Sequence, residues 1–240
     1  MENNTTMNCA CVIHSNKYDW TYVQKLYNML EKHSRREIKF HVFTEKERPV
    51  PTHMVKHCLE DWPGVSGPKK SWWYKIQLFN NTHISGPLLY MDLDVVLAQN
   101  IDWIWELDTQ FFWAVHDFRR LWTPSWGGLN SSIMYWNTEK WGQVWENFKS
   151  KNIASTIKQF HGDQDFLNTQ FTENQLCFFD NSLIKSWRWQ LKDGGLNPKT
   201  RLYNKPGAGT LLDSNTAIMI FHGDPKPHEV HDTVIKTLWN

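Results

Sequence analysis

The fold of this chain is decided by one stretch of eleven residues, Pro87-Leu88-Leu89-Tyr90-Met91-Asp92-Leu93-Asp94-Val95-Val96-Leu97. Its first part is an unbroken apolar run with the length of a buried strand, and apolar residues resume directly after the second aspartate. We therefore expect a core strand that two carboxylates interrupt. Residues i and i+2 of a strand point to the same side, so Asp92 and Asp94 are predicted to face one way.

Two carboxylates on one side of a strand can share a divalent cation. Hard oxygen ligands of this kind suit Mn²⁺ or Mg²⁺, which also coordinate diphosphate oxygens. An unpaired charge within an apolar run costs several kcal/mol unless a cation or another partner compensates it. The alternative is a strand end that simply reaches solvent. The second Asp-x-Asp, Asp163-Gln164-Asp165, follows Gly162 and is typical of a helix cap instead.

The residues before this stretch predict a βαβ unit. An apolar strand at 9–13 precedes a helix that Asp19 caps and that ends near His33, and Ile38–Thr44 forms the next strand. Residues 45–70 are rich in proline and glycine, which favours a loop with at most one short helix at Met54–Leu59. A further helix is expected from Ser71 to about Asn80.

The residues after this stretch continue the alternation of strands and helices. Strands are predicted at 111–115, 132–136 and 217–221, and helices at 138–148 and 163–171. Residues 187–213 are rich in glycine, proline and asparagine, and long irregular segments of this kind are more often functional than idle. We find no repeat and no interdomain linker. The prediction is a flexible tail at 1–7 and one α/β domain at 8–240, with a mixed, mainly parallel sheet flanked by helices.

Composition excludes several classes of protein. The chain has 240 residues, and 26 Lys and Arg against 25 Asp and Glu give a net charge of +1, which argues against a dedicated nucleic-acid binder. Its 15 tryptophans exclude a disordered chain. The four cysteines lack metal-site spacing and are expected to be reduced. No apolar run reaches the length of a membrane span, and we expect a soluble, cytoplasmic protein of unknown oligomeric state.

A second polar group follows the apolar strand predicted at 217–221. His222 offers a neutral imidazole that can complete an oxygen-rich Mn²⁺ site. Gly223 lets backbone approach a ligand, and Lys226 supplies a point charge for phosphate. The alternative is an ordinary surface turn with an exposed histidine and lysine.

Six blocks, in this order, carry a resemblance to a known family. They are NCACVIHSNKYDW (8–20), WWYKIQLF (72–79), LLYMDLDVVL (88–97), LNSSIMYWN (129–137), HGDQDFLN (161–168) and FHGDPKPHEV (221–230). This series resembles the nucleotide-sugar glycosyltransferases of the GT-A fold and is most similar to family 8, the group of glycogenin and the lipopolysaccharide galactosyltransferases. The family's loop between the histidine and the lysine is longer than the one between His222 and Lys226.

The resemblance implies a role for each matching residue. In the donor site, His14, Ser15 and Tyr18 would receive the base and ribose, Lys75 and Asn130 would approach the donor sugar, and Gly223 and Lys226 would contact the phosphates. Asp92, Asp94 and His222 would hold Mn²⁺ or Mg²⁺. Asp163 and Gln164 would lie beside the anomeric carbon as catalytic residues. The resemblance also implies transfer with retention of configuration.

Tryptophans in turn-rich sequence are candidates for binding the acceptor. Trp122 and Trp126 lie among Thr, Pro and Gly residues, and we expect their faces to stack on an acceptor sugar. Core packing is expected for six others: Trp103, Trp105, Trp113, Trp136, Trp141 and Trp145.

The sequence thus predicts an Mn²⁺-dependent hexosyltransferase that uses a UDP-linked donor and a glycan or glycoconjugate acceptor. Two rivals stay open. One is a phosphohydrolase or nucleotidyltransferase that uses Asp92 and Asp94, although such enzymes normally need further acidic ligands. The other is a non-catalytic carbohydrate-binding protein whose tryptophans perform the recognition. Metal-dependent binding of UDP distinguishes the transferase from the binding protein.

Overall fold

The computed structural model describes residues 6–62, 65 and 70–240. Residues 1–5 of the predicted tail lie outside this range. The strands are β1 (Met7–Val12), β2 (Ile38–Thr44), β3 (Val55–Cys58), β4 (Pro87–Met91), β5 (Val95–Leu97), β6 (Phe112–His116), β7 (Leu129–Asn137), β8 (Leu176–Phe178), β9 (Ile184–Ser186) and β10 (Ile218–Ile220). The α-helices are α1 (Trp20–His33), α2 (Thr138–Trp141), α3 (Gln143–Ser150), α4 (Ile153–Gln159), α5 (Asp163–Asn168) and α6 (Thr233–Leu238). The 3-10 helices are η1 (Ser71–Phe79), η2 (Asp102–Glu106), η3 (Phe118–Leu121) and η5 (Pro227–Glu229), and η4 (Trp187–Leu191) is a π-helix.

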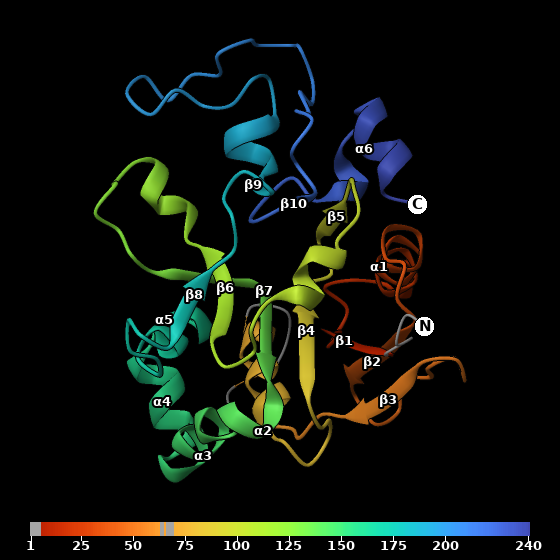
Figure 1. Cartoon of the computed structure of the whole chain (residues 1–240), viewed down its shortest axis with the longest axis vertical. Coiled ribbons are helices and arrows are strands. Elements are labelled where there is room, and N and C mark those ends of the chain that lie inside the picture. Colours follow the sequence, from red (N-terminus) through yellow and green to blue (C-terminus); the bar gives the residue numbers. More distant parts are fainter. Residues whose placement is uncertain (1–5, 63–64, 66–69) are drawn as a thin grey trace.

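A seven-stranded sheet organises these elements in the order β3-β2-β1-β4-β7-β6-β8 (Figure 1). The pairs β1–β2, β2–β3, β1–β4 and β6–β8 are parallel, whereas β7 is antiparallel to both of its neighbours. The predicted mixed, mainly parallel sheet is thus confirmed. A second sheet, β5-β10-β9, was not predicted, although the strand expected at 217–221 is β10, because the pairing of segments so far apart in the sequence is not visible in any of them.

Alternate residues of the central strands enter two separate cores, as the pleat of a strand requires. In β1, Cys9 and Cys11 face a core with α1, whereas Ala10 faces a core built with η1, α3 and α5. The second core is rich in aromatic rings: Phe79 stacks on Trp136 with ring centroids 4.8 Å apart. Both faces of the sheet are therefore covered, and polar groups reach solvent at the strand ends.

The βαβ unit predicted at the start of the chain is confirmed. Asp19 caps α1 by accepting a hydrogen bond of 2.9 Å from the backbone N–H of Thr21, and α1 connects the parallel strands β1 and β2. The strand β1 begins at Met7, and no helix among the described residues is long and apolar enough to cross a membrane.

Two of the predicted helices differ in the structure. Residues 55–58 form β3 rather than the helix expected at Met54–Leu59, because this segment pairs with the exposed edge of β2. The pairing adds backbone hydrogen bonds that local sequence does not reveal. The helix expected at 138–148 divides at Gly142 into α2 and α3.

The two aspartates of the deciding stretch lie on a turn and not within a strand, contrary to the prediction. The strand β4 ends at Met91, the backbone N–H of Val95 donates to the carbonyl of Asp92 at 3.3 Å, and β5 then enters the second sheet. Leu93 stays buried between the two aspartates. The turn therefore keeps the apolar residues of the stretch buried and places both carboxylates at the junction of the two sheets.

Three histidines pack together near β3, away from this junction. The Nδ1 of His41 lies 2.9 Å from the Nε2 of His57, and the ring of His57 lies 5.4 Å from that of His83. Burial, followed by the neighbouring His57, lowers the pKa of His41 to about 3, and burial and His83 lower the pKa of His57 to about 4. Between these lowered pKa values and the ordinary value of 6.5, both rings are therefore neutral in the folded protein and protonated in the unfolded chain.

This difference predicts a loss of stability in acid. The free energy of unfolding should fall as the pH drops through the unfolded value near 6.5 and level off near the folded pKa values. For His41 alone we expect a loss of about 2 kcal/mol between pH 7 and pH 5. Urea denaturation of the wild type and of His41→Gln at both pH values measures it, because the variant lacks this contribution. A stability difference between the two proteins that is independent of pH would contradict the assignment.

Candidate active site

The candidate site lies where β1 and β4 end side by side at the centre of the sheet. From β1 the chain continues to β2 and β3 on one side of the sheet, whereas β4 and the later strands lie on the other side of β1. The strand order therefore reverses between β1 and β4. Ligands of open α/β sheets bind beyond the carboxyl ends of strands at such a switch point. His14 follows β1 and Asp92 follows β4, which brings two of the predicted blocks together.

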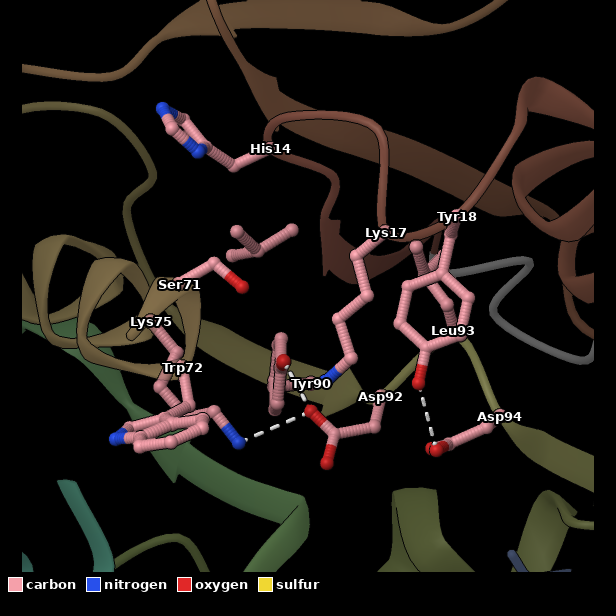
Figure 2. A pocket seen from close by; sticks show the side chains of 11 residues that line it. His14, Lys17, Tyr18, Ser71, Trp72, Lys75, Tyr90, Asp92, Leu93 and Asp94 are labelled. Atoms are coloured by element: carbon pink, nitrogen blue, oxygen red, sulfur yellow. Dashed lines mark hydrogen bonds and ion pairs between the residues drawn. The ribbon is translucent and has the colours of Figure 1, made fainter. Parts of the chain in front are cut away.

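A cleft of about 660 Å³ opens at this point. The predicted residues that line it are Lys75, Asp92, Asp94, Trp126, Asn130, Asp163, Gln164, His222, Gly223 and Lys226. A smaller adjoining cavity is lined by His14 and Tyr18 and shares Lys75, Asp92 and Asp94 with the cleft (Figure 2). Ser15 lines neither cavity, and its backbone N–H donates to Glu45 instead. Segments far apart in the sequence therefore converge on one site.

The two aspartates each bind one lysine and one tyrosine. Asp92 lies 3.0 Å from the Nζ of Lys75 and accepts the hydroxyl of Tyr90. Asp94 accepts the hydroxyl of Tyr18 at 2.8 Å and the Nζ of Lys226 at 2.5 Å. Figure 2 shows the Asp92 carboxylate beside the Lys75 ammonium and the Asp94 carboxylate beside the Tyr18 hydroxyl. Their charges are thus compensated by the chain itself.

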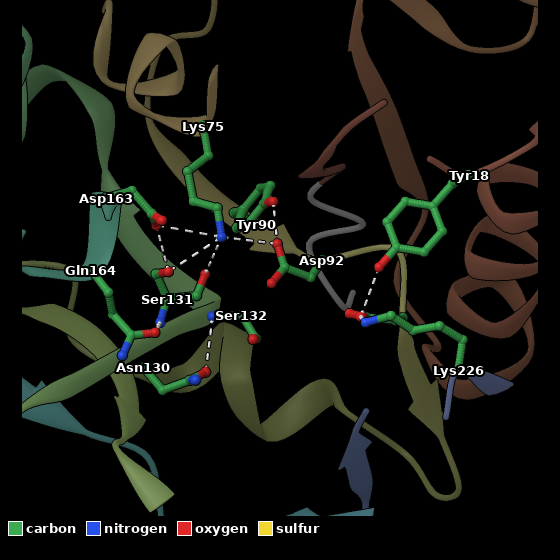
Figure 3. Close-up of polar contacts among 11 residues, drawn as sticks. Tyr18, Lys75, Tyr90, Asp92, Asn130, Ser131, Ser132, Asp163, Gln164 and Lys226 are labelled. Carbon is green, nitrogen blue, oxygen red and sulfur yellow. Dashed lines mark hydrogen bonds and ion pairs between the residues drawn. The ribbon is translucent and has the colours of Figure 1, made fainter. Parts of the chain in front are cut away.

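Lys75 joins the aspartate turn to α5 (Figure 3). Its Nζ lies 3.5 Å from the Oδ2 of Asp163 and 3.2 Å from the Oγ of Ser131, and that hydroxyl donates to Asp163 at 2.6 Å. Burial disfavours the charge of Lys75, yet Asp163 and Asp92 raise its pKa above the ordinary value. Burial raises the pKa of Asp163, against the opposing effect of Lys75. The network is a buried cation held between two carboxyl groups.

Asp163 is not the helix cap that its position after Gly162 suggested. Gly162 is the N-cap of α5, and the Asp163 carboxylate turns away from the helix backbone to Ser131 and Lys75. Gln164 also faces this network, because its Oε1 accepts the backbone N–H of Ser131 at 3.3 Å. Both predicted catalytic side chains are therefore held in place by one residue of β7.

His222 lies at the far wall of the cleft, after β10. Its Nε2 lies 2.6 Å from the Oγ of Ser186, and its ring stacks on Phe118 with centroids 5.2 Å apart. Burial, followed by the nearby Arg188, lowers the pKa of His222 to about 4. The imidazole is therefore neutral near pH 7, which is the form that binds metals.

The predicted cation ligands fit a Mn²⁺ or Mg²⁺ site in their chemistry. Asp92 and Asp94 offer carboxylate oxygens, His222 offers a neutral ring, and all three line the cleft. Over residues 6–62, 65 and 70–240 no three acidic, histidine or cysteine side chains are grouped closely enough to hold an ion. Lys75 and Lys226 supply positive charge to the same two carboxylates instead.

The tryptophans predicted to bind the acceptor lie in two different places. Trp126 lines the cleft, whereas Trp122 lines a separate cavity of about 280 Å³ with Trp189. Each of the two rings already carries an arginine over one face. Of the six tryptophans expected in the core, Trp105, Trp136, Trp141 and Trp145 are buried and Trp103 and Trp113 pack against the core.

Sequence reasoning assigned no role in the site to Lys17, Ser131 and Arg119 of the cleft or to Tyr90 of the adjoining cavity. Lys17 lies in the loop after β1, and burial, followed by Lys226, lowers its pKa. Tyr90 was identifiable, because it precedes Asp92 by two residues. Ser131 follows the predicted Asn130, whose own Oδ1 accepts the backbone N–H of Ser132. No sequence signal indicated Arg119.

The buried network predicts a large effect on stability. Lys75→Met should lower the free energy of unfolding by about 3 kcal/mol, because it leaves Asp163 buried without its cation. Lys75→Met/Asp163→Leu should recover part of the loss, since neither charge then remains. Urea denaturation at pH 7 measures both, with Lys140→Met as the control because Lys140 is exposed. A single variant as stable as Lys140→Met would show that the cation does not stabilise the fold.

Comparisons with known proteins identify the fold. No protein-family model and no curated protein sequence matches the chain. The structure of the galactosyltransferase LgtC with donor and acceptor sugar analogues matches with a TM-score of 0.64 and 14% identity, over 98% of this chain and 97% of LgtC. An active-site mutant of LgtC gives a TM-score of 0.66 at 14% identity, over 95% and 91% of the two chains. Mouse xyloside xylosyltransferase 1 gives 0.54 at 13% identity, over 92% and 100%. The chain has the GT-A fold that its sequence blocks predicted, which is the fold of these glycosyltransferase structures.

Proposed function

We propose that this protein is a glycosyltransferase that moves a hexose from a nucleotide diphosphate sugar to a carbohydrate acceptor. The observation that carries the proposal is the single cleft, at the switch point of a GT-A fold, that collects Asp92, Asp94, His222 and several lysines. LgtC, which has the same fold, was solved with donor and acceptor sugar analogues. The donor that we propose is UDP-linked, and the transfer retains configuration, as in the family that the sequence resembles.

The charges of the cleft suit a diphosphate. Lys17, Lys75 and Lys226 all line it, and the Nζ of Lys226 lies 2.5 Å from Asp94 and 3.3 Å from the carbonyl of Phe221. An ammonium near the cleft surface can turn from a carboxylate to a phosphate oxygen at little cost, because one charge-assisted bond replaces another. His14 and Tyr18, in the adjoining cavity, lie where a base and ribose would follow the diphosphate.

Asp92, Asp94 and His222 would hold the Mn²⁺ or Mg²⁺ ion of such an enzyme. The ion would supply charge neutralisation to the departing nucleoside diphosphate. Lys226, whose Nζ lies 2.5 Å from Asp94, contributes to the same stabilisation.

Asp163 and Gln164 define the position of the donor sugar. The Asp163 carboxylate is buried and accepts a hydrogen bond from Ser131, so it is a poor nucleophile. This favours attack by the acceptor hydroxyl on the face from which the diphosphate departs, with the hydroxyl proton passing to the leaving phosphate oxygen. The bond from C1 to the diphosphate breaks as the bond from C1 to the acceptor oxygen forms. Trapping a glycosylated Asp163 by mass spectrometry would overturn this route.

Replacing Asp94 tests the proposed donor site. The variant Asp94→Asn keeps the shape of the side chain and removes its charge, and we expect it to weaken Mn²⁺-dependent binding of UDP by at least about tenfold, the loss of one strong charged interaction. Isothermal titration calorimetry with UDP, with and without Mn²⁺, measures it. The matched control is Glu146→Gln, because Glu146 is an exposed acid on α3 outside the cleft.

The same titrations discriminate the rival functions. If the wild type does not bind UDP in the presence of Mn²⁺, the proposal is contradicted. Binding of a glycan without nucleotide or metal would favour a carbohydrate-binding protein. Hydrolysis of a nucleotide without sugar transfer would favour a phosphohydrolase.

A further inference from the structure

Two tryptophans beside the cleft carry an arginine over the ring. The guanidinium carbon of Arg119 lies 4.3 Å from the ring centre of Trp126, and that of Arg201 lies 4.1 Å from the ring centre of Trp122. These are the rings that the sequence suggested as platforms for a sugar. One face of each ring is therefore occupied by a cation, which changes the kind of ligand that this part of the molecule suits.

The pair of Arg119 and Trp126 is held firmly. The Nε1 of Trp126 donates to the Oδ2 of Asp117 at 2.9 Å, and the Oδ1 of Asp117 accepts the backbone N–H of Arg119 at 2.8 Å. Asp117 thereby fixes both the ring and the start of η3. A guanidinium that lies over an aromatic ring keeps the N–H groups along its edge available for a further ligand.

Among the residues that the structure describes, Arg119 has no anionic partner. It is exposed, it lines the cleft together with Asp163 and Gln164, and its guanidinium forms no ion pair with a carboxylate in the described part of the chain. The Asp117 carboxylate accepts the backbone and not the side chain of Arg119. This contrasts with Lys75 and Lys226, which are each bound to an aspartate.

Further basic residues follow the strand β9 along the chain. Figure 1 shows that the segment between β6 and β7 and the long segment between β9 and β10 project beyond the same end of the large sheet. The second segment carries a basic group of residues with Asp193 as its one acid between 187 and 205: Arg188, Lys192, Lys199, Arg201 and Lys205. Arg188 borders the cleft, because a Cβ built on Gly223 would lie 3.8 Å from its Nη1.

We propose that the acceptor is an anionic glycan whose phosphate or carboxylate group is bound by Arg119 on its Trp126 platform. The inference rests on the proposed function and names the class of acceptor. A planar guanidinium binds either oxyanion through two parallel hydrogen bonds, which a lysine cannot reproduce. The donor diphosphate is the less suitable ligand for Arg119, because Lys75 and Lys226 are already placed for it. The arginine enters the cleft from η3, next to the predicted sugar position at Asp163 and Gln164.

Sugar probes that differ in charge alone test the proposal. Ligand-observed NMR titrations with glucose, glucose 6-phosphate and glucuronate, each with UDP and Mn²⁺ present, compare neutral, phosphate and carboxylate probes. We expect the wild type to bind at least one charged probe about tenfold or more tightly than glucose, the effect of one strong charge-assisted contact. The charged probe that binds more tightly identifies the oxyanion.

Three variants assign the preference to Arg119. Arg119→Gln should abolish it, and Arg119→Lys should restore only part of it, because the charge returns without the paired N–H groups. Arg35→Gln, which changes an exposed arginine outside the cleft, should leave it intact. The melting temperature of each variant checks that the fold is preserved, and UDP binding to Arg119→Gln should stay within about twofold of the wild type, well below the cost of a lost phosphate contact.

Each contrary result has a distinct meaning. Equal affinity of the wild type for glucose and both charged probes would overturn the proposal, as would a preference that survives in Arg119→Gln. A loss of UDP binding in Arg119→Gln as large as the loss of the charged probe would assign the arginine to the donor instead. A wild type that does not bind UDP at all would overturn the proposed function itself.

Discussion

The buried ammonium of Lys75 is the constraint on which the site depends. It joins η1 to the aspartate turn through Asp92, to β7 through Ser131 and to α5 through Asp163. A buried cation without partners is too costly to maintain, so the three partner segments must be in place together when the chain folds. The same contacts that satisfy the lysine also aim Asp163 at the cleft. One network of contacts therefore both stabilises the fold and preorganises the site.

The small second sheet explains how His222 enters the same cleft as the aspartates, although it lies more than a hundred residues away in the sequence. The strand β10 pairs antiparallel with β5, with Ile220 opposite Val95, and the backbone N–H of Phe221 continues the pairing by donating to the carbonyl of Asp94 at 3.2 Å. This register sets His222 and the following Gly223 against the aspartate turn. The turn therefore ends one sheet, begins the other and fixes the position of the opposite wall of the cleft.

The sequence predicts the parts of this arrangement that are local, and not those that depend on register. Apolar runs and helix periodicity identify β4, β2 and α1, because the apolar pattern of each segment by itself predicts which of its residues are buried. The strand β3 was predicted as a helix, since its conformation comes from pairing with β2. Asp163 looked like a cap for the same reason: the partners that turn it away, Lys75 and Ser131, are distant in sequence.

The two ends of the cleft differ in charge, and the net charge of the whole chain does not show this difference. At the aspartate turn Lys75 and Lys226 each meet a carboxylate, so these charges compensate one another before any ligand binds. At the other end the Arg119 guanidinium rests on an aromatic ring, which stabilises a cation without neutralising it. A net charge of +1 over the whole chain is compatible with this asymmetry, because acids elsewhere balance the sum. Over distances longer than roughly 10 Å salt screens those acids, so an anion at Arg119 responds to the charges of the cleft and not to the total charge.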